Sequence, residues 1–185
     1  MRTRVKGRKI VIAIAGPHGA GRTTQAVRLA RAFGLKHVST GTLFRERAEE
    51  LGIRIEEMTR IASEDPAFDR LSDDRAKKET RKGGVVLDAT LSGWMAEHPD
   101  LRIYLTAPFS ERVRRIHERE GRTIKEVERE TELREKAEKE RFLKYYGINL
   151  DDLTIYDLIL NTGLFDIDAT ANILKNVVDA YLDER

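Results

Sequence analysis

Short apolar runs alternate with longer amphipathic or charged segments along the whole chain. The runs are rich in Val, Ile and Leu and end at Gly, Pro or polar residues, which is typical of buried parallel strands. They predict strands over 9–15, 35–38, 85–89, 101–106 and 155–160. The intervening segments have apolar residues at helical spacing, and Gly residues end several of them. They predict helices over 23–33, 41–51, 55–63, 66–82, 110–119, 123–146 and 167–182.

Two residues mark helix starts in this pattern. Pro66 stands at the start of a charged helix, and Thr123 precedes the longest helix as its N-cap. Strands that alternate with helices predict an α/β fold, a doubly wound five-stranded parallel sheet with helices on both faces. We expect residues 1–185 to form a single domain. Ligands in such sheets bind beyond the carboxyl ends of the strands, so we expect the chemistry there.

Composition excludes several classes of protein. Charged residues make up 36% of the 185 residues and there is no Cys, so disulfides, thiolate metal sites and a Cys nucleophile are excluded. The excess of Lys, Arg and Glu is typical of heat-adapted proteins. No apolar run approaches the ~18 residues of a membrane span, and no signal peptide precedes the first strand. We therefore expect a cytoplasmic protein. Residues 1–8 form a basic arm, either a solvated terminus or a contact to RNA phosphates.

A glycine-rich loop joins the first strand to the first helix. It matches the G-x4-G-K-[ST] pattern, with Arg22 in place of Lys, and its glycines allow backbone N–H groups to surround a phosphate. Thr23 has the position of the hydroxyl that binds Mg²⁺. We expect His18 to point to solvent and to have no catalytic role. The predicted ATP-binding residues of the loop are Gly16, Pro17, His18, Gly19, Ala20, Gly21, Arg22, Thr23 and Thr24.

Several segments resemble the archaeal cytidylate kinases, a branch of the P-loop nucleoside monophosphate kinases. They are VIAIAGPHGAGRTT, LKHVSTGTLFRERAEE, FDRLSDDRAKKE, VVLDATLSGWMA and YYGINLDDLTIYDLILNT, within a resemblance that covers about 9–183. The resemblance implies monophosphate-binding helices over about 41–82 and a lid over about 119–146. It also implies transfer of the γ-phosphoryl group of ATP to CMP, with dCMP or UMP as further acceptors and Mg²⁺ as cofactor.

Three residues depart from the family pattern near the expected reaction centre. Arg22 stands where this branch often has Thr, Thr42 where the family has Asp, and Thr90 where it has Arg. A missing guanidinium at position 90 would weaken the hold on the acceptor phosphate. Thr90→Arg is therefore expected to raise kcat/KM for CMP.

The resemblance also implies acceptor-binding residues. Arg45 would bind the acceptor phosphate, and Asp69 and Asp73, which share a helix face, would bind its base and ribose. Asp88 would hold a Mg²⁺-bound water, although it could instead cap the next short helix. Trp94 would border the acceptor base, although a lone Trp is more often a packing residue.

The remaining roles belong to the lid and the last strand. Arg134 and Arg141 are seven residues apart and share one side of the long helix. The alternative is a solvated helix with ion pairs such as Glu130–Arg134. The predicted catalytic residues are Arg22, Arg119, Arg134 and Arg141. Asn161 and Thr162 would border the ATP base.

Two functions remain open at this level. One is a monophosphate kinase that acts as a monomer on small-molecule nucleotides, without a membrane partner. The other is an ATP-binding protein with weak or lost kinase activity that binds RNA or a ribonucleoprotein. The three departures and the basic arm favour the second function, whereas the arginines and the closing segment favour the first.

Overall fold

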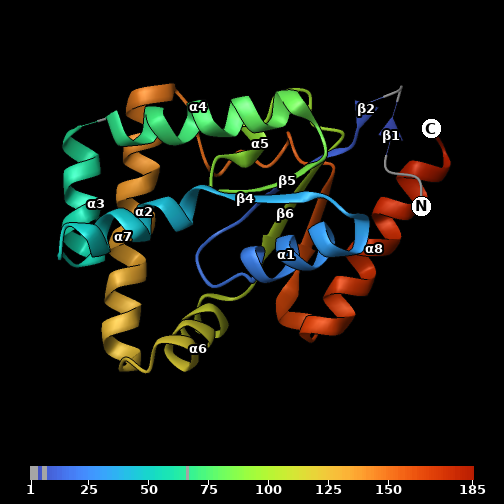
Figure 1. Ribbon diagram of the computed structural model, residues 1–185. Helices are drawn as coiled ribbons and strands as arrows, with labels where there is room; N and C mark the ends of the chain where they lie inside the picture. The colour runs from blue at the N-terminus through green and yellow to red at the C-terminus, as the bar shows by residue number, and fades with distance from the viewer. Residues whose placement is uncertain (1–3, 6–7, 66) are drawn as a thin grey trace.

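The computed structural model describes residues 4–5, 8–65 and 67–185 (Figure 1). Its sheet has five parallel strands in the order β4-β5-β3-β6-β7, which confirms the doubly wound α/β prediction. The strands are β3 (Val11–Ala15), β4 (Lys36–Ser39), β5 (Val85–Asp88), β6 (Leu101–Thr106) and β7 (Leu158–Asn161).

The helices follow the predicted pattern closely. They are α1 (Arg22–Phe33), α2 (Thr40–Glu50), α3 (Ile55–Glu64), α4 (Ala67–Lys82), α5 (Ser92–Met95), α6 (Phe109–Glu120), α7 (Ile124–Tyr146) and α8 (Ile167–Asp183), with a 3₁₀ turn η1 (Thr162–Leu164). Thr123 caps α7 as predicted, and Glu126 completes a capping box with it. Pro66 lies outside the described residues. None of the described helices is long and apolar enough to cross a membrane.

Two strands begin at least two residues later than predicted, and the basic arm contains strands of its own. β1 (Arg4–Val5) pairs antiparallel with β2 (Arg8–Lys9), so Lys9 belongs to this hairpin and not to the central strand. β7 begins at Leu158 because a turn precedes it, in which the amide of Tyr156 donates to the carbonyl of Leu153. Residues 1–3, 6 and 7 of the arm are outside the described part of the chain.

Alternation along β3 divides the core into two layers. Ile12 and Ile14 face a cluster built with α1 and α8, whereas Val11 and Ala13 face one built with α4, α5 and the end of α7. All four side chains are fully buried, and burial of each large apolar side chain contributes roughly 1.5–3 kcal/mol. Figure 1 shows the resulting layers, with α1 and α8 on one side of the sheet and α4 and α5 on the other.

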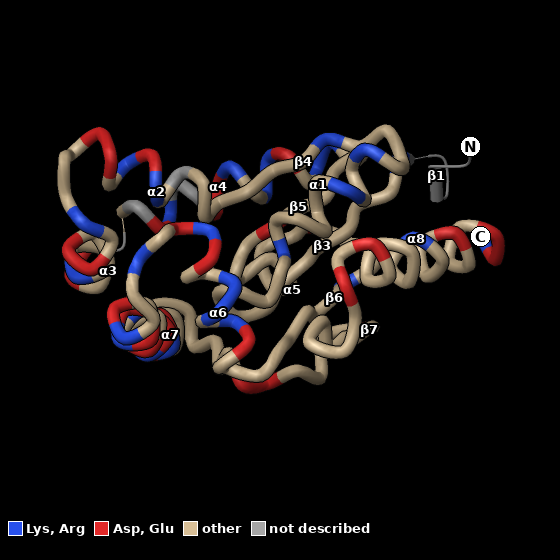
Figure 2. The backbone as a smooth tube through the Cα atoms, turned by 90° about the horizontal axis from the view of Figure 1, so that it is seen from below, with Lys and Arg blue, Asp and Glu red and all other residues tan. Residues whose placement is uncertain are grey.

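The order of the strands opens a crevice at the carboxyl end of β3. The chain leaves β3 for β4 on one side of the sheet, and it later forms β6 on the other side. Helices that follow neighbouring strands therefore diverge at this point, as at ligand sites of doubly wound sheets. The charged helix α7 stands beside this crevice and packs against α3 and α6. Figure 2 shows α7 end-on, with acidic and basic residues around its circumference.

Candidate active site

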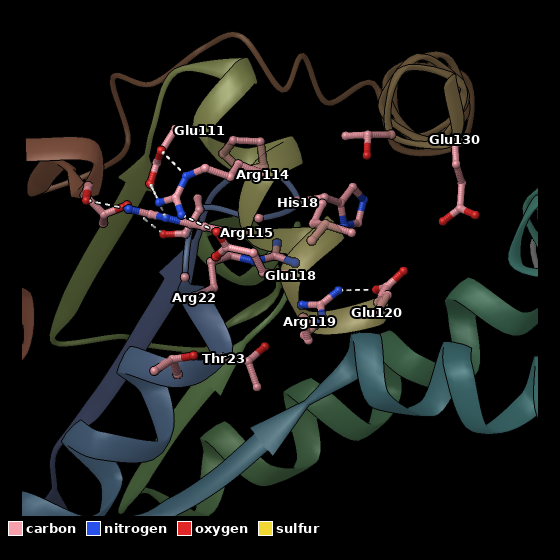
Figure 3. A pocket seen from close by; sticks show the side chains of 18 of the residues that line it. His18, Arg22, Thr23, Glu111, Arg114, Arg115, Glu118, Arg119, Glu120 and Glu130 are labelled. Atoms are coloured by element: carbon pink, nitrogen blue, oxygen red, sulfur yellow. Dashed lines mark hydrogen bonds and ion pairs between the residues drawn. The ribbon is translucent and has the colours of Figure 1, made fainter. Parts of the chain in front are cut away.

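A cleft of about 1450 Å³ lies at the carboxyl edge of the sheet. The glycine-rich loop, the start of α1, α2, α6, α7 and the start of α8 contribute its walls, and the loop residues 17–24 all line it. Figure 3 shows that arginines from α6 face His18 and Arg22 of the loop across this space. The predicted phosphate loop therefore opens into this cleft.

The loop needs its glycines for two different reasons. A Cβ at Gly16 would lie 2.0 Å from the carbonyl oxygen of Leu105, and one at Gly19 would lie 2.6 Å from the carbonyl oxygen of Arg112. Gly21 has open space around it, but its φ of +87° is left-handed and strained for other residues. Close approach and backbone conformation together hold the loop in the shape that an anion requires.

Asp88 and Thr23 form the oxygen pair at the start of α1. The hydroxyl of Thr23 donates to Oδ2 of Asp88 at 2.6 Å, and Asp88 is 1% exposed. Burial alone would raise the pKa of Asp88, but the nearby His37 and Arg22 outweigh it and hold the pKa below its usual range. The alternative that Asp88 caps the next helix does not hold, because Leu91 is the N-cap of α5.

These two oxygens suit a magnesium ion that keeps most of its water. Mg²⁺ is usually held by one or two protein oxygens together with substrate phosphates. Among the described residues there is no group of three or more His, Cys, Asp or Glu side chains that could enclose a metal by itself. The donor set of Thr23 and Asp88 therefore fits a metal that arrives with a nucleotide.

Two of the residues that depart from the family pattern are in contact. Nη1 of Arg22 donates to Oγ1 of Thr90 at 3.1 Å, and Nε of Arg22 lies 3.6 Å from Oδ1 of Asp88. Only 12% of the Arg22 side chain is exposed. A guanidinium is therefore present at the end of β5 even though residue 90 is Thr, and it comes from the loop.

Of the other arginines that line the cleft with Arg22, three belong to the predicted site. They are Arg45 of α2, Arg119 of α6 and Arg134 of α7. Partial burial lowers the pKa of Arg45, and the charges of Arg119 and Arg134 lower it further. Nε of Arg134 is buried without a hydrogen-bond partner among the described residues. Like charges that approach each other in this way are stabilised when a polyanion lies between them.

Glu130 and Arg134 of α7 do not form the ion pair that the alternative of a solvated helix suggested. Glu130 accepts instead from Nη1 of Arg122 at 2.6 Å, just before the start of the helix. Arg134 is left facing the cleft, with its guanidinium 5.9 Å from the ring centre of Phe44.

Arg141 and the two predicted acceptor-binding aspartates lie together away from the open cleft. Nε of Arg141 is 2.8 Å from Oδ2 of Asp69, and the hydroxyl of Tyr146 donates to Asp73. Burial raises the pKa of Asp69 to about 6, with a further contribution from Asp73 and an opposing one from Arg141. Nη1 of Arg141 is buried without a hydrogen-bond partner in the described part of the chain. The cluster thus offers a buried donor and a buried acceptor.

The segment after β7 is tied to the phosphate loop. Oγ1 of Thr162 donates to the carbonyl of Ala20 at 3.0 Å and accepts from Nη1 of Arg115 at 2.9 Å. The Asn161 side chain accepts from the amide of Gly163 and so shapes this turn.

Trp94 lies outside the lining of the cleft. It belongs to α5 and packs edge-to-face on Tyr156, with 5.7 Å between ring centres, against the core layer built with α4 and α5. This placement agrees with the packing alternative for a lone Trp.

The expectation that His18 points to solvent is wrong. Its side chain is only 15% exposed, and its Nε2 lies 3.0 Å from Oε1 of Glu138 on α7. Sequence reasoning missed this pair, and it missed Arg115, because their partners are distant in the chain and no spacing rule connects them.

Comparisons with known proteins agree with this geometry. A model of the cytidylate kinase-like family matches residues 11–164. A cytidylate kinase of Staphylothermus marinus is 43% identical over 176 residues, which cover 95% of this chain and 99% of the relative. One of Halobacterium salinarum is 43% identical over 179 residues, 95% and 93% of the two chains. A solved shikimate kinase of Bacteroides thetaiotaomicron has a TM-score of 0.59 at 17% identity, covers 92% and 98% of the two chains and shares the fold.

Proposed function

We propose that this chain, which belongs to the cytidylate kinase-like family, transfers the γ-phosphoryl group of ATP to CMP. The observation that carries the proposal is that Arg22, Arg45, Arg119 and Arg134 line the same cleft as the glycine-rich loop. Phosphoryl transfer needs in-line positioning and neutralisation of charge on the moving group, and little covalent chemistry. Arginine suits both needs because its planar fork binds phosphate oxygens in pairs.

We assign the donor to the loop side of the cleft. The loop amides and the start of α1 would bind the ATP phosphates, and the turn at Asn161 and Thr162 would border the base. Thr23 would coordinate Mg²⁺ directly and Asp88 through water, and the ion when bound would neutralise charge between the β- and γ-phosphates. Arg22, held by Asp88 and Thr90, would stand between the donor and acceptor phosphates.

We assign the acceptor to α2, α4 and α7. Arg45 would bind its phosphate, and Arg119 and Arg134 would contact the transferring group. The buried pair would read the base. Ionised Asp69 accepts from the amino group of cytosine, and Nη1 of Arg141, which has no hydrogen-bond partner among the described residues, donates to the ring nitrogen beside it. Uracil has an acceptor oxygen in place of the amino group and an N–H donor in place of the acceptor nitrogen. This pair therefore favours CMP or dCMP over UMP.

A coupled assay with ATP, Mg²⁺ and each nucleoside monophosphate in turn tests the proposal. We expect CMP to give the highest kcat/KM, dCMP to follow and UMP to be at least tenfold lower, because each mispaired buried polar group costs about 1–3 kcal/mol. Absence of turnover with every monophosphate would overturn the assignment.

The alternative of an RNA-binding protein without kinase activity loses much of its support. It depended on the basic arm and on the departures at residues 22, 42 and 90 around the expected reaction centre. Arg22 supplies a guanidinium beside Thr90, and Thr42 accepts a hydrogen bond from Nη2 of Arg45 at 3.4 Å. The departures therefore do not remove the charge that a phosphoryl transfer needs.

A further inference from the structure

His18 is held by two helices through three of its polar groups. Its ring Nε2 lies 3.0 Å from Oε1 of Glu138, and its main-chain amide donates to Oε1 of Glu135 at 3.2 Å. Its carbonyl accepts from Nη1 of Arg112 at 2.8 Å. Arg112 is itself paired with Glu135, so α6 and α7 hold this loop residue together.

The pair of His18 and Glu138 is a charge-assisted hydrogen bond in a largely buried place. The two side chains are 15% and 13% exposed. Burial alone would raise the pKa of Glu138, but His18, Arg134 and Arg141 outweigh it and hold the pKa far below its usual range. Glu138 is thus a carboxylate, which only accepts, so Nε2 of His18 carries the proton. Such bonds are roughly twice as strong as neutral ones.

The contacts place one face of α7 against the phosphate loop. Glu135 and Glu138 are three residues apart and therefore lie on the same face, one turn from each other. Arg134, which lines the cleft, directly precedes Glu135. Oε2 of Glu138 also accepts from Oγ1 of Thr90 at 3.4 Å, and Thr90 accepts from Arg22. The loop is therefore joined to α7 near both of its ends.

We propose that His18 is a positioning residue, which fixes α7 on the phosphate loop and thereby sets where Arg134 stands over the transferring phosphoryl group. This role goes beyond the proposed function. The kinetic test of the role rests on the proposed function, because it measures kinase activity. His18 itself takes no part in the chemical step. Its effect belongs to kcat more than to ATP affinity, because the contacts lie between the loop and the helix and leave the rest of the loop open to the cleft.

Four variants test this role. His18→Ala removes the ring contact, His18→Gln keeps an N–H donor of similar reach, and Glu138→Gln removes the carboxylate. Glu140→Gln is the matched control, since it removes the same charge from an exposed position of the same helix. The measurements are kcat and KM for ATP and CMP, with hydrogen exchange of amides 134–142 in the nucleotide-free protein.

We expect His18→Ala to lower kcat at least about tenfold, with KM for ATP within about threefold, since a charge-assisted bond is lost. Amides 134–142 should exchange faster, and His18→Gln should recover most of both effects. The double variant of His18→Ala with Glu138→Gln should lose no more than the worse single variant, because the two residues act through one bond. Glu140→Gln should behave as the parent protein.

Three results would overturn the role of His18. The first is an unchanged kcat in His18→Ala. The second is a loss that disappears at temperatures where the variant is fully folded, since a merely structural role predicts that. The third is a double variant whose kcat falls by the product of the two factors measured for the single variants. If the parent protein phosphorylates no monophosphate, the proposed function fails, and hydrogen exchange alone then decides. Faster exchange only in the His18 and Glu138 variants would support the proposal that His18 fixes α7 on the loop, and unchanged exchange would refute it.

Discussion

Single residues decide whether the loop can receive a phosphate, and Gly21 shows this most directly. Its φ is +87°, and a Cβ added there would have no atom within 4 Å. Gly21→Val therefore changes the backbone preference and not the packing. A left-handed β-branched residue costs at least ~1–2 kcal/mol, so we expect calorimetry to show ATP affinity reduced at least about tenfold. Gly34→Val is the control, because Gly34 has a φ of +62°, open space and a place at the far end of α1. It should lower stability without changing ATP affinity, and unchanged affinity in Gly21→Val would contradict the loop assignment.

The contact of Arg22 with Thr90 revises the expectation for Thr90→Arg. From the sequence alone that substitution restores a missing guanidinium, but Arg22 already lies 3.1 Å from Thr90. A second guanidinium would meet like charge, so we expect Thr90→Arg alone to leave kcat/KM for CMP unchanged or lower. Arg22→Thr should lower it about tenfold or more through loss of a charge-assisted bond.

The double variant of Arg22→Thr with Thr90→Arg should recover most of this loss, because it returns one guanidinium to the same place from the other side. Steady-state kinetics on the four proteins of this cycle measure the coupling. Independent effects at the two positions would show that the guanidinium does not serve one shared site.

Asp69 makes a pH-dependent prediction about the acceptor. Its pKa is raised to about 6, and only the ionised carboxylate accepts from the cytosine amino group through both oxygens. The ratio of kcat/KM for CMP to that for UMP should therefore rise as pH increases from about 5 to 7. The substrate phosphate ionises in the same pH range, but its effect on kcat/KM cancels in this ratio. In Asp69→Asn the ratio should be low and independent of pH. A parent protein with a flat ratio would remove Asp69 from base recognition.

At the scale of elements, α7 is the part of the molecule expected to move. Its ends are anchored by Val127, which packs on α6, and by Phe142, which packs in the core layer of the sheet. The stretch between them is mostly charged and owes its place to ion pairs and hydrogen bonds, which nucleotide phosphates can rearrange. Hydrogen exchange across 119–146 should slow when a bisubstrate analogue that joins ATP to CMP is bound. Equal protection with and without the analogue would show a static surface helix.

The elements themselves were largely predictable from the sequence, because their causes are local. Apolar runs, glycine stops and the Thr123–Glu126 capping box all act over a few residues. The hairpin at Arg4–Val5 was not predictable, since charged two-residue strands carry no periodic pattern. The contacts of His18 with Glu138 and of Arg22 with Thr90 join positions 120 and 68 residues apart. Such pairs depend on tertiary packing, which one sequence does not reveal.

At the scale of the whole molecule, the β1–β2 pair of the basic arm and the cleft lie at opposite ends of the sheet. The hairpin precedes the amino end of β3, and the phosphate loop follows its carboxyl end. The five residues of β3 therefore separate them by about 16 Å at ~3.3 Å per residue. In Figure 1 the hairpin lies near the chain termini at the end of α8, away from α6 and α7.

Deletion of residues 1–8 tests what this separation means for function. We expect kcat and KM for ATP and CMP to stay within about twofold of the parent values, because the described strands of the arm lie at the far end of the sheet from the cleft, beyond the ~8–10 Å range of ionic screening. Retention on single-stranded RNA at low salt should be measured for both proteins. If the arm binds RNA, its deletion abolishes a retention that declines steeply with salt. If kinase activity falls with the arm, the hairpin supports the central strand, and the separation of the two ends of the sheet is not a separation of functions.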